Sequence, residues 1–200
     1  MKHLEEKDLP LFLHELDKYQ GNFVCKSAVW FVLYTHARTN EIRFAEWSDI
    51  DFDLKQWNIP AEKMKMGVSQ TIPLSRQAIA ILESLKPITG NYKYIFASTI
   101  SLSKPISENG MLSVIYNMGY KGKTTIHGLR GTYSTIANET LKFRRDAIEA
   151  ALAHKVNDPV RESYCHATYL EERTVNAQVW ADYLDQLKQG ADVIPIKRKA

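Results

Sequence analysis

Apolar side chains recur at helical spacing in the first quarter of the chain. In residues 8–19 the spacing is that of one buried helix face, with the apolar positions at Leu9, Phe12, Leu13 and Leu16. Residues 23–38 are apolar on nearly every side and therefore predict a central, buried helix. A short helix is expected to follow at 40–47.

The pattern then changes to short apolar segments. These segments are interrupted by Pro60, Gly67 and Pro73, which predicts two or three short antiparallel strands with a hairpin at residues 62–67. Helical spacing returns at 76–86, where Ser75 is the expected N-cap.

The second half of the chain predicts helices again after a loop at 87–107. They are expected at about 108–117, 126–139, 143–153 and 171–188. The predicted class is therefore α+β, mostly α-helical with a small antiparallel β-sheet of two or three strands. Residues 1–188 are expected to form one domain and residues 189–200 a mobile basic tail.

Composition narrows the class of protein without naming a function. The 200 residues are 44% hydrophobic and 24% charged, which excludes a disordered or collagen-like chain. The longest apolar run, 28–34, is far shorter than the roughly 20 residues of a membrane span. Cys25 and Cys165 form no disulfide framework, and the sequence begins with no signal peptide. A soluble, cytosolic protein without a membrane partner is expected.

Positive charge is concentrated in one segment. The chain carries only +3 overall, but residues 121–145 hold six Lys and Arg against Glu139 alone. Such a local excess indicates either a binding surface for a polyanion or a solvated basic face.

Several enzyme classes lack their motifs here. There is no Gly-x-Gly-x-x-Gly, no phosphate loop ending in Gly-Lys-Ser/Thr, no His-Glu-x-x-His and no Gly-x-Ser-x-Gly. Cys165 and His166 are adjacent, which is not zinc-ligand spacing. We therefore expect no metal and no cofactor. The remaining candidates are cationic, imidazole and phenol side chains, in chain order Arg38, Lys65, His127, Arg130, His154 and Tyr164.

This ordered set resembles the catalytic residues of the tyrosine recombinases, the lambda-integrase family. Three short sequences are similar to motifs of that family. They are Thr-His-Ala-Arg-Thr-Asn-Glu around Arg38, His-Gly-Leu-Arg-Gly-Thr around Arg130 and Leu-Ala-His-Lys at 152–155. The segment 160–173 is most similar to integrases of prophages and genomic islands. The resemblance covers roughly residues 8–188 and implies the catalytic-domain fold of that family.

The residue types suit the chemistry that the resemblance implies. Arg38 and Arg130 would hold the two non-bridging oxygens of a phosphodiester with planar charged forks. Tyr164 would attack and form a 3′-phosphotyrosyl link, so that cutting and rejoining need neither metal nor ATP.

Three further residues assist in this scheme. Lys65, on the hairpin, would protonate the leaving 5′-oxygen. His127 and His154 would orient the phosphate or assist proton movement. Tyr169 is the competing nucleophile, and Tyr164 is preferred because it lies ten residues after His154 rather than fifteen.

Two positions depart from the family pattern. His36 stands where many relatives have Gly, and Gln70 where close relatives often carry His. The change at Gln70 is expected to alter contacts between the hairpin and DNA.

The resemblance also implies partners. They are double-stranded DNA attachment sites, other recombinase protomers in a tetramer on DNA (with a monomer alone), and accessory DNA-bending proteins, in the cytoplasm at the nucleoid. The family's N-terminal core-binding and arm-binding domains are expected to be absent from this chain. The alternatives are a catalytically silent DNA-binding remnant of a prophage integrase and a type IB topoisomerase-like DNA-relaxing enzyme.

Overall fold

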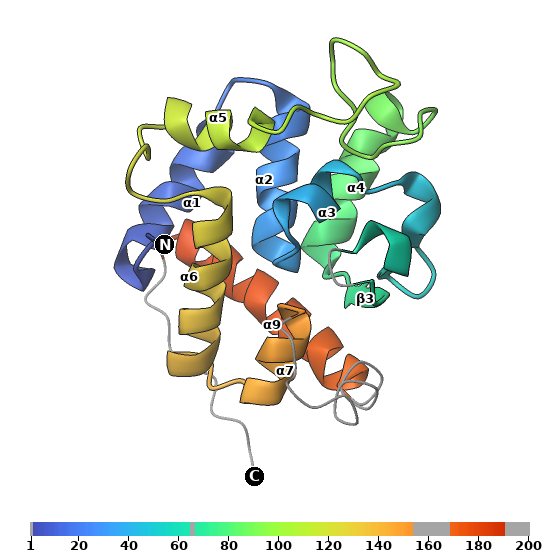
Figure 1. The fold of residues 1–200 in the computed structure, drawn as a ribbon. Coiled ribbons are helices and arrows are strands. Elements are labelled where there is room, and N and C mark those ends of the chain that lie inside the picture. Colours follow the sequence, from blue (N-terminus) through green and yellow to red (C-terminus); the bar gives the residue numbers. More distant parts are fainter. Residues whose placement is uncertain (1, 65–66, 154–168, 191–200) are drawn as a thin grey trace.

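Helices form most of the molecule, and a three-stranded antiparallel sheet lies at one side of them (Figure 1). The structure, a computed structural model, describes residues 2–64, 67–153 and 169–190. The expected α+β class with a small antiparallel sheet is confirmed.

The α-helices follow the predicted order. Within the described residues they are α1 (Leu9–Lys18), α2 (Phe23–Thr35), α3 (Thr39–Arg43), α4 (Arg76–Thr89), α5 (Gly110–Asn117), α6 (Ile126–Glu139), α7 (Arg145–Ala151) and α9 (Leu170–Lys188). Short 3₁₀ helices are η1 (Glu6–Asp8), η2 (Trp47–Asp49) and η3 (Ala61–Lys63). In the described part of the chain, no helix is long and apolar enough to cross a membrane.

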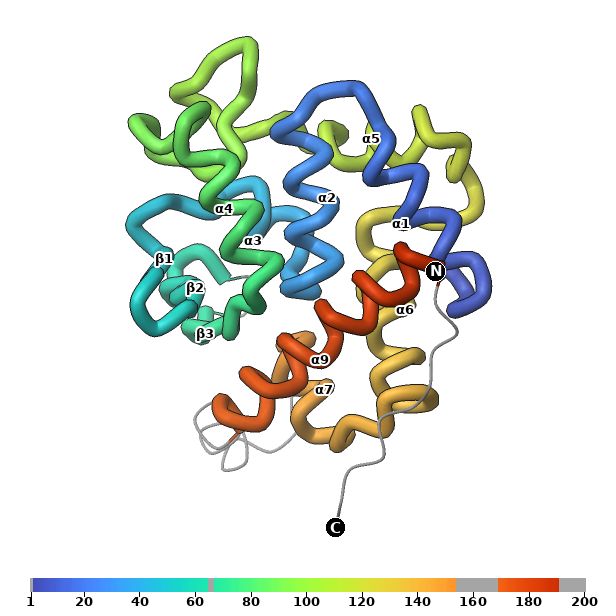
Figure 2. The backbone as a smooth tube through the Cα atoms, turned by 180° about the vertical axis from the view of Figure 1, so that it is seen from behind, coloured from blue at the N-terminus to red at the C-terminus, as the bar shows by residue number. Residues whose placement is uncertain are grey.

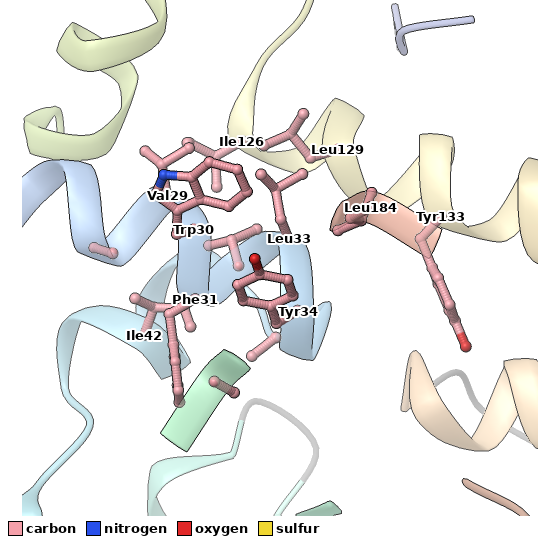
Figure 3. Close-up of a cluster of buried hydrophobic side chains, with 14 of the residues drawn as sticks. Val29, Trp30, Phe31, Leu33, Tyr34, Ile42, Ile126, Leu129, Tyr133 and Leu184 are labelled. Atoms are coloured by element: carbon pink, nitrogen blue, oxygen red, sulfur yellow. The ribbon is translucent and has the colours of Figure 1, made fainter. Parts of the chain in front are cut away.

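Helix α2 is the centre of the core, as its apolar sequence predicts, and it contacts α4, α5, α6 and α9. Figure 3 shows its Val29 and Leu33 near Leu129 of α6. The helix ends at Thr35, not at Arg38 as expected, because His36 adopts the left-handed conformation with φ 55° and stops the helical hydrogen bonding. Arg38 consequently lies outside α2.

The sheet consists of β1 (Ile50–Asp51), β2 (Gln56–Ile59) and β3 (Gln70–Pro73), in the order β1-β2-β3. Strands β2 and β3 are antiparallel, with Trp57 opposite Ile72. Trp57 is fully buried and its ring contacts Phe31 of α2 at a centroid distance of 5.5 Å. This contact fixes the sheet against the central helix. The residues between β2 and β3 begin with η3 where a simple hairpin was expected.

Other helix boundaries also differ from the prediction: α3 ends at Arg43 where a helix was expected to continue to 47, and two further differences have identifiable reasons. Helix α4 begins at the predicted N-cap Ser75, whose hydroxyl accepts from the Ala78 amide at 3.2 Å. It continues past Pro87 to Thr89, whose hydroxyl contacts the carbonyl oxygens of Leu85 and Ile95 and holds the last turn. Helix α7 is shorter than expected, since the left-handed Ala153 ends the segment that was predicted at 143–153.

Helix α9 closes the molecule from behind, where Figure 2 shows it crossing from α1 toward the sheet. It contacts α1, α2, α4, α7 and β3, which are otherwise far apart in the sequence. The indole of Trp180 donates a hydrogen bond to the carbonyl oxygen of Leu33 at 2.7 Å and so ties α9 to α2. Elements from both ends of the chain therefore share one core.

Candidate active site

Arg38 is held at the start of α3 by an acidic partner in the same turn. Its guanidinium pairs with the Glu41 carboxylate at 2.8 Å, while its backbone N–H donates to the other carboxylate oxygen at 2.6 Å. The Glu41 side chain is only 4% exposed and that of Arg38 is 25% exposed. The charge of Arg38 is thus fixed in position by a buried counter-charge.

Arg130 comes from α6, whose start is fixed by the Thr125 hydroxyl accepting from the Gly128 amide at 3.1 Å. The side chain is buried, and its guanidinium donates to the carbonyl oxygens of His36 and Leu152, the latter at 2.7 Å. Burial, together with the nearby charge of Arg38, lowers the pKa of Arg130 to about 10, while Glu41 acts in the opposite direction. Arg130 therefore remains a cation at neutral pH.

The two arginines meet at the C-terminal end of α7. Arg38 donates to the Ala153 carbonyl oxygen at 2.7 Å and approaches that of Leu152 at 3.4 Å, the same oxygen that Arg130 contacts. The last carbonyl groups of a helix have no partner within the helix, and the negative end of its dipole favours cations. The end of α7 thus brings together two guanidinium groups that are 92 residues apart in the sequence.

An open groove of about 1080 Å³ passes beside this pair. Arg38 and His127 both line it, and His127 is an exposed residue in the first turn of α6. Arg130, one turn further along α6, is buried and is not among the lining residues. The remaining walls come from α3, η3 and the start of α5, so with α6 the groove joins segments from four parts of the chain.

Gly128 allows the N-terminal segment to approach α6 closely. A Cβ atom at this position would lie 2.3 Å from the carbonyl oxygen of Lys2, a separation that no side chain tolerates. Two residues further along the segment, Leu4 exchanges hydrogen bonds with the hydroxyl of Thr132, at 3.0 and 3.1 Å. This segment covers the face of α6 that carries Gly128, Gly131 and Thr132.

Arg38, His127 and Arg130 are the predicted site residues that the structure describes, and it brings all three to one place. Lys65, His154 and Tyr164 lie outside the described residues.

Tyr169, the competing nucleophile, is described. Its hydroxyl lies 3.5 Å from the Asp146 carboxylate, and its ring lies under the Arg144 guanidinium, 4.2 Å from ring centroid to Cζ. Both contacts are at the N-terminal end of α7, whereas the arginines bind its C-terminal end, about 10 Å away along seven helical residues.

Two residues that hold the arginines, Glu41 and His36, were not predicted as such from the sequence, and neither was the contact of Gln70 with the end of α7. A glutamate three residues after the N-cap position commonly accepts from the N-cap backbone N–H, so the spacing from Arg38 to Glu41 could have identified Glu41. The expected effect of Gln70 on contacts between the hairpin and DNA stays a prediction. Its side chain is buried and its amide points to the carbonyl oxygens of Ala150 and Ala151, at 3.5 and 3.3 Å, in the last turn of α7.

In the described part of the chain no group of three or more His, Cys, Asp or Glu residues is arranged to hold a metal ion.

Solved structures with the same fold define the class of protein. The integrase from mycobacterium phage Brujita aligns with a TM-score of 0.64 at 14% identity, covering 96% of this chain and 58% of that chain. A lambda integrase tetramer bound to a Holliday junction aligns with a TM-score of 0.60 at 18% identity, covering 80% of this chain and 49% of that chain. The fold is that of a tyrosine recombinase catalytic domain.

Sequence comparison then gives the family. Residues 2–171 match the phage integrase family, and the chain belongs to that family. It is 37% identical over 197 residues to the integrase of Enterobacteria phage P4, covering 91% of this chain and 45% of the relative. It is 36% identical over 194 residues to prophage integrase IntA of Escherichia coli (strain K12), covering 97% and 47%. The chain thus spans about half the length of these curated relatives.

Proposed function

We propose that residues 1–188 are the catalytic domain of a site-specific DNA recombinase of the integrase type. The observation that carries the proposal is the meeting of two guanidinium groups at one carbonyl oxygen beside an open groove. Arginine presents several donors in a planar fork, which suits the non-bridging oxygens of a phosphodiester. Relatives with this fold include a lambda integrase solved on a Holliday junction.

The charge near the groove supports a polyanionic substrate. Lys121 and Lys123 are exposed in the turn that leads into α6, whose first turn presents His127 to the groove. Four glutamates also line the groove: Glu41 is paired with Arg38 and Glu46 with Lys63 at 2.9 Å, whereas Glu62 and Glu108 are exposed. DNA phosphates would therefore be attracted by Arg38 and the two exposed lysines beside the groove, against the opposing charge of Glu62 and Glu108.

The proposed reaction conserves the phosphodiester bond energy. The Tyr164 hydroxyl attacks phosphorus and passes its proton to His127 or His154, forming a phosphotyrosyl bond, and the bond to the 5′-oxygen breaks as Lys65 gives that oxygen a proton. Arg38 and Arg130 oppose the charge of the pentacoordinate transition state, and His127 and His154 orient the phosphate. The reverse attack by a 5′-hydroxyl of another strand joins the DNA, so the scheme needs neither metal nor ATP.

The proposal extends to the partners and the location. Attachment-site duplexes, three further protomers on the DNA and accessory bending proteins would complete the reaction in the cytoplasm. Only the first two have a parallel among the similar structures, as with the lambda integrase tetramer on a Holliday junction.

The test is the formation of a covalent protein–DNA complex. The chain is incubated with nicked duplexes carrying randomised core sequences, and the products are separated on a denaturing gel. We expect a shifted band that Tyr164→Phe abolishes and Tyr169→Phe retains. Arg130→Lys should reduce its rate of formation by about 10²–10³-fold, because lysine keeps the charge but loses the fork.

Other outcomes distinguish the alternatives. Loss of the band only in Tyr169→Phe would keep the family and change the nucleophile. DNA binding without a band from any variant would favour the silent DNA-binding module. Relaxation of supercoiled plasmid without sequence preference would favour the topoisomerase-like enzyme.

A further inference from the structure

His36 lies at the point where α2 ends and the segment carrying Arg38 begins. It has φ 55° and ψ 17°, in the left-handed region that few residues other than glycine adopt. Its side chain is nevertheless buried, with 5% of the residue exposed. A buried ring at a strained turn indicates that the ring itself stabilises this conformation.

The ring of His36 is stacked on Tyr133. Their centroids are 3.4 Å apart and their planes differ by 7°. Tyr133 in turn packs edge-on against Trp180 of α9, with centroids 5.1 Å apart, and Trp180 also contacts His36. The turn is therefore held by aromatic contacts from α6 and α9, two elements that are distant in the sequence.

The backbone of the same residue holds Arg130, whose guanidinium donates to the His36 carbonyl oxygen. Tyr133 and Arg130 are both on α6, separated by three residues, so the ring contact and the carbonyl contact join the turn to neighbouring positions of one helix. Arg38 follows two residues later in the chain and shares the Leu152 carbonyl oxygen with Arg130. The geometry of one turn thus determines how far apart the two guanidinium groups lie.

Resting on the function proposed above, we propose that His36 is a positioning residue for the paired arginines. Its ring, by stacking on Tyr133, fixes the left-handed turn whose carbonyl oxygen holds Arg130 and from which Arg38 extends. This positioning role depends on the flat shape of the His36 ring and not on its nitrogen atoms.

Three variants distinguish the contribution of the His36 ring from that of the left-handed turn. His36→Asn keeps a residue type that tolerates the left-handed conformation but removes the ring. His36→Phe keeps a flat ring, and a cavity of about 20 Å³ beside His36, Tyr133 and Arg173 gives the larger ring some room. Tyr133→Leu removes the stacking partner without changing the turn residue, and it serves if His36→Asn does not fold.

The first readout is the Arg130 guanidinium in ¹⁵N-edited NMR spectra of the full chain without DNA. Its signals are identified by their loss in Arg130→Lys. We expect separate, slowly exchanging Nη signals in the wild type and in His36→Phe, and averaged signals in His36→Asn and Tyr133→Leu. Wild-type Arg130 signals in both His36→Asn and Tyr133→Leu would overturn the proposal, as would equal averaging in His36→Asn and His36→Phe.

The second readout is single-turnover formation of the covalent complex, with DNA affinity measured separately by fluorescence anisotropy. His36→Asn should slow cleavage at least tenfold while changing the dissociation constant less than twofold, since misplaced arginines affect the reaction more than binding. His36→Phe should stay within about threefold of the wild type. A parallel loss of affinity and rate would assign His36 a merely structural role. If the wild type forms no covalent complex while the NMR result is as expected, the proposed function fails and the positioning role stands.

Discussion

Glu41 is the carboxylate that compensates two guanidinium groups in the site. It bonds both the side chain and the backbone of Arg38, and its charge also favours the protonated form of Arg130. The residue is buried, so water contributes little to stabilising either partner. This makes the site sensitive to the loss of a single negative charge.

Glu41→Gln should lower the free energy of unfolding by about 1–3 kcal/mol, because it leaves charged donors with a neutral partner in a poorly solvated place. Urea denaturation at pH 7 measures the change. Glu108→Gln, the same chemical change at an exposed position of the groove, should alter the free energy by less than about 0.5 kcal/mol. Equal effects of the two variants would show that Glu41 has no special role.

His36 predicts a pH dependence of stability. Its burial, with the neighbouring charges of Arg130 and Arg173, holds the pKa of its imidazole well below the ordinary value near 6.5. Below pH 6.5 the His36 imidazole becomes protonated in the unfolded chain but stays neutral in the folded chain, so the free energy of unfolding falls as the pH falls. The slope contributed by one such group is at most about 1.4 kcal/mol per pH unit.

Urea denaturation at pH 7.0 and 5.5 tests this dependence. His36→Asn should reduce the difference between the two pH values by about 1 kcal/mol, whereas His14→Asn, on the exposed face of α1, should not. An unchanged difference in His36→Asn would contradict the assignment.

Arg38, His127 and Arg130 were predicted from the resemblance of their order and surrounding motifs to those of the tyrosine recombinases, and the structure brings them to one place. Gln70 and His36 were not understood, because their importance depends on which backbone carbonyl groups lie beside them. Those neighbours are far away in the sequence, and no local pattern encodes them.

At the scale of elements, the end of α7 is a meeting point for side chains from three others. The amide of Gln70 in β3 points to the carbonyl oxygens of residues 150 and 151. Arg130 of α6 donates to the carbonyl oxygen of residue 152, and Arg38 contacts those of residues 152 and 153. The four successive carbonyl groups of residues 150–153 are thus contacted by side chains from outside α7, and that of Ala150 also accepts from the Ala153 amide. The helix depends on the sheet and the arginines for its C-terminal stability.

Gln70→Ala should destabilise α7 locally, since the Ala151 carbonyl group loses its side-chain donor and that of Ala150 keeps only backbone donors. Hydrogen exchange of the α7 amides should speed up by about three- to tenfold, corresponding to roughly 0.5–1.5 kcal/mol, while α2 remains protected. Asn58→Ala, on the exposed side of β2, is the matched control. Faster exchange throughout the molecule would indicate global destabilisation instead.

Helix α6 shows what local sequence predicts well. Its observed bounds, 126–139, equal the expected ones because Thr125 is a good N-cap and the apolar spacing is regular. The end of α2 was not predicted, because a histidine in the sequence does not indicate a left-handed backbone conformation as a glycine does. The continuation of α4 past Pro87 was missed because it depends on the tertiary contact between Thr89 and Ile95.

For the whole molecule, α9 is the element that joins the sheet side to the α1 side (Figure 2). Trp180 is 1% exposed, and its single polar atom is satisfied by Leu33 of the central helix. The helix was predicted from its spacing, yet its partners could not be, since they come from five separate elements.

Trp180→Phe should lower the free energy of unfolding by about 2–4 kcal/mol, because it leaves the Leu33 carbonyl without its donor and a cavity in the core. Thermal unfolding followed by circular dichroism measures this. Val175→Ala, at an exposed position on the same helix, should change stability by less than about 0.5 kcal/mol. A Trp180→Phe variant as stable as the wild type would show that α9 is not an integral part of the core.

Electrostatics of the whole molecule can be tested through salt. Under the proposed function, the affinity for a duplex should fall linearly with the logarithm of salt concentration. The slope should decrease by about one in Arg38→Gln, which removes one phosphate contact. Fluorescence anisotropy between 50 and 300 mM salt tests this. An unchanged slope would place Arg38 away from bound phosphate.

The contact between α1 and α9 has a consequence for how the protein is made. The buried face of α1, which includes Leu9, Phe12 and Leu13, is synthesised long before α9, one of the elements that cover it. At ordinary translation rates these segments are separated by on the order of ten seconds. During that time the nascent chain exposes apolar surface of α1 that α9 covers in the folded protein, so this part of the core is completed only after α9 has been made.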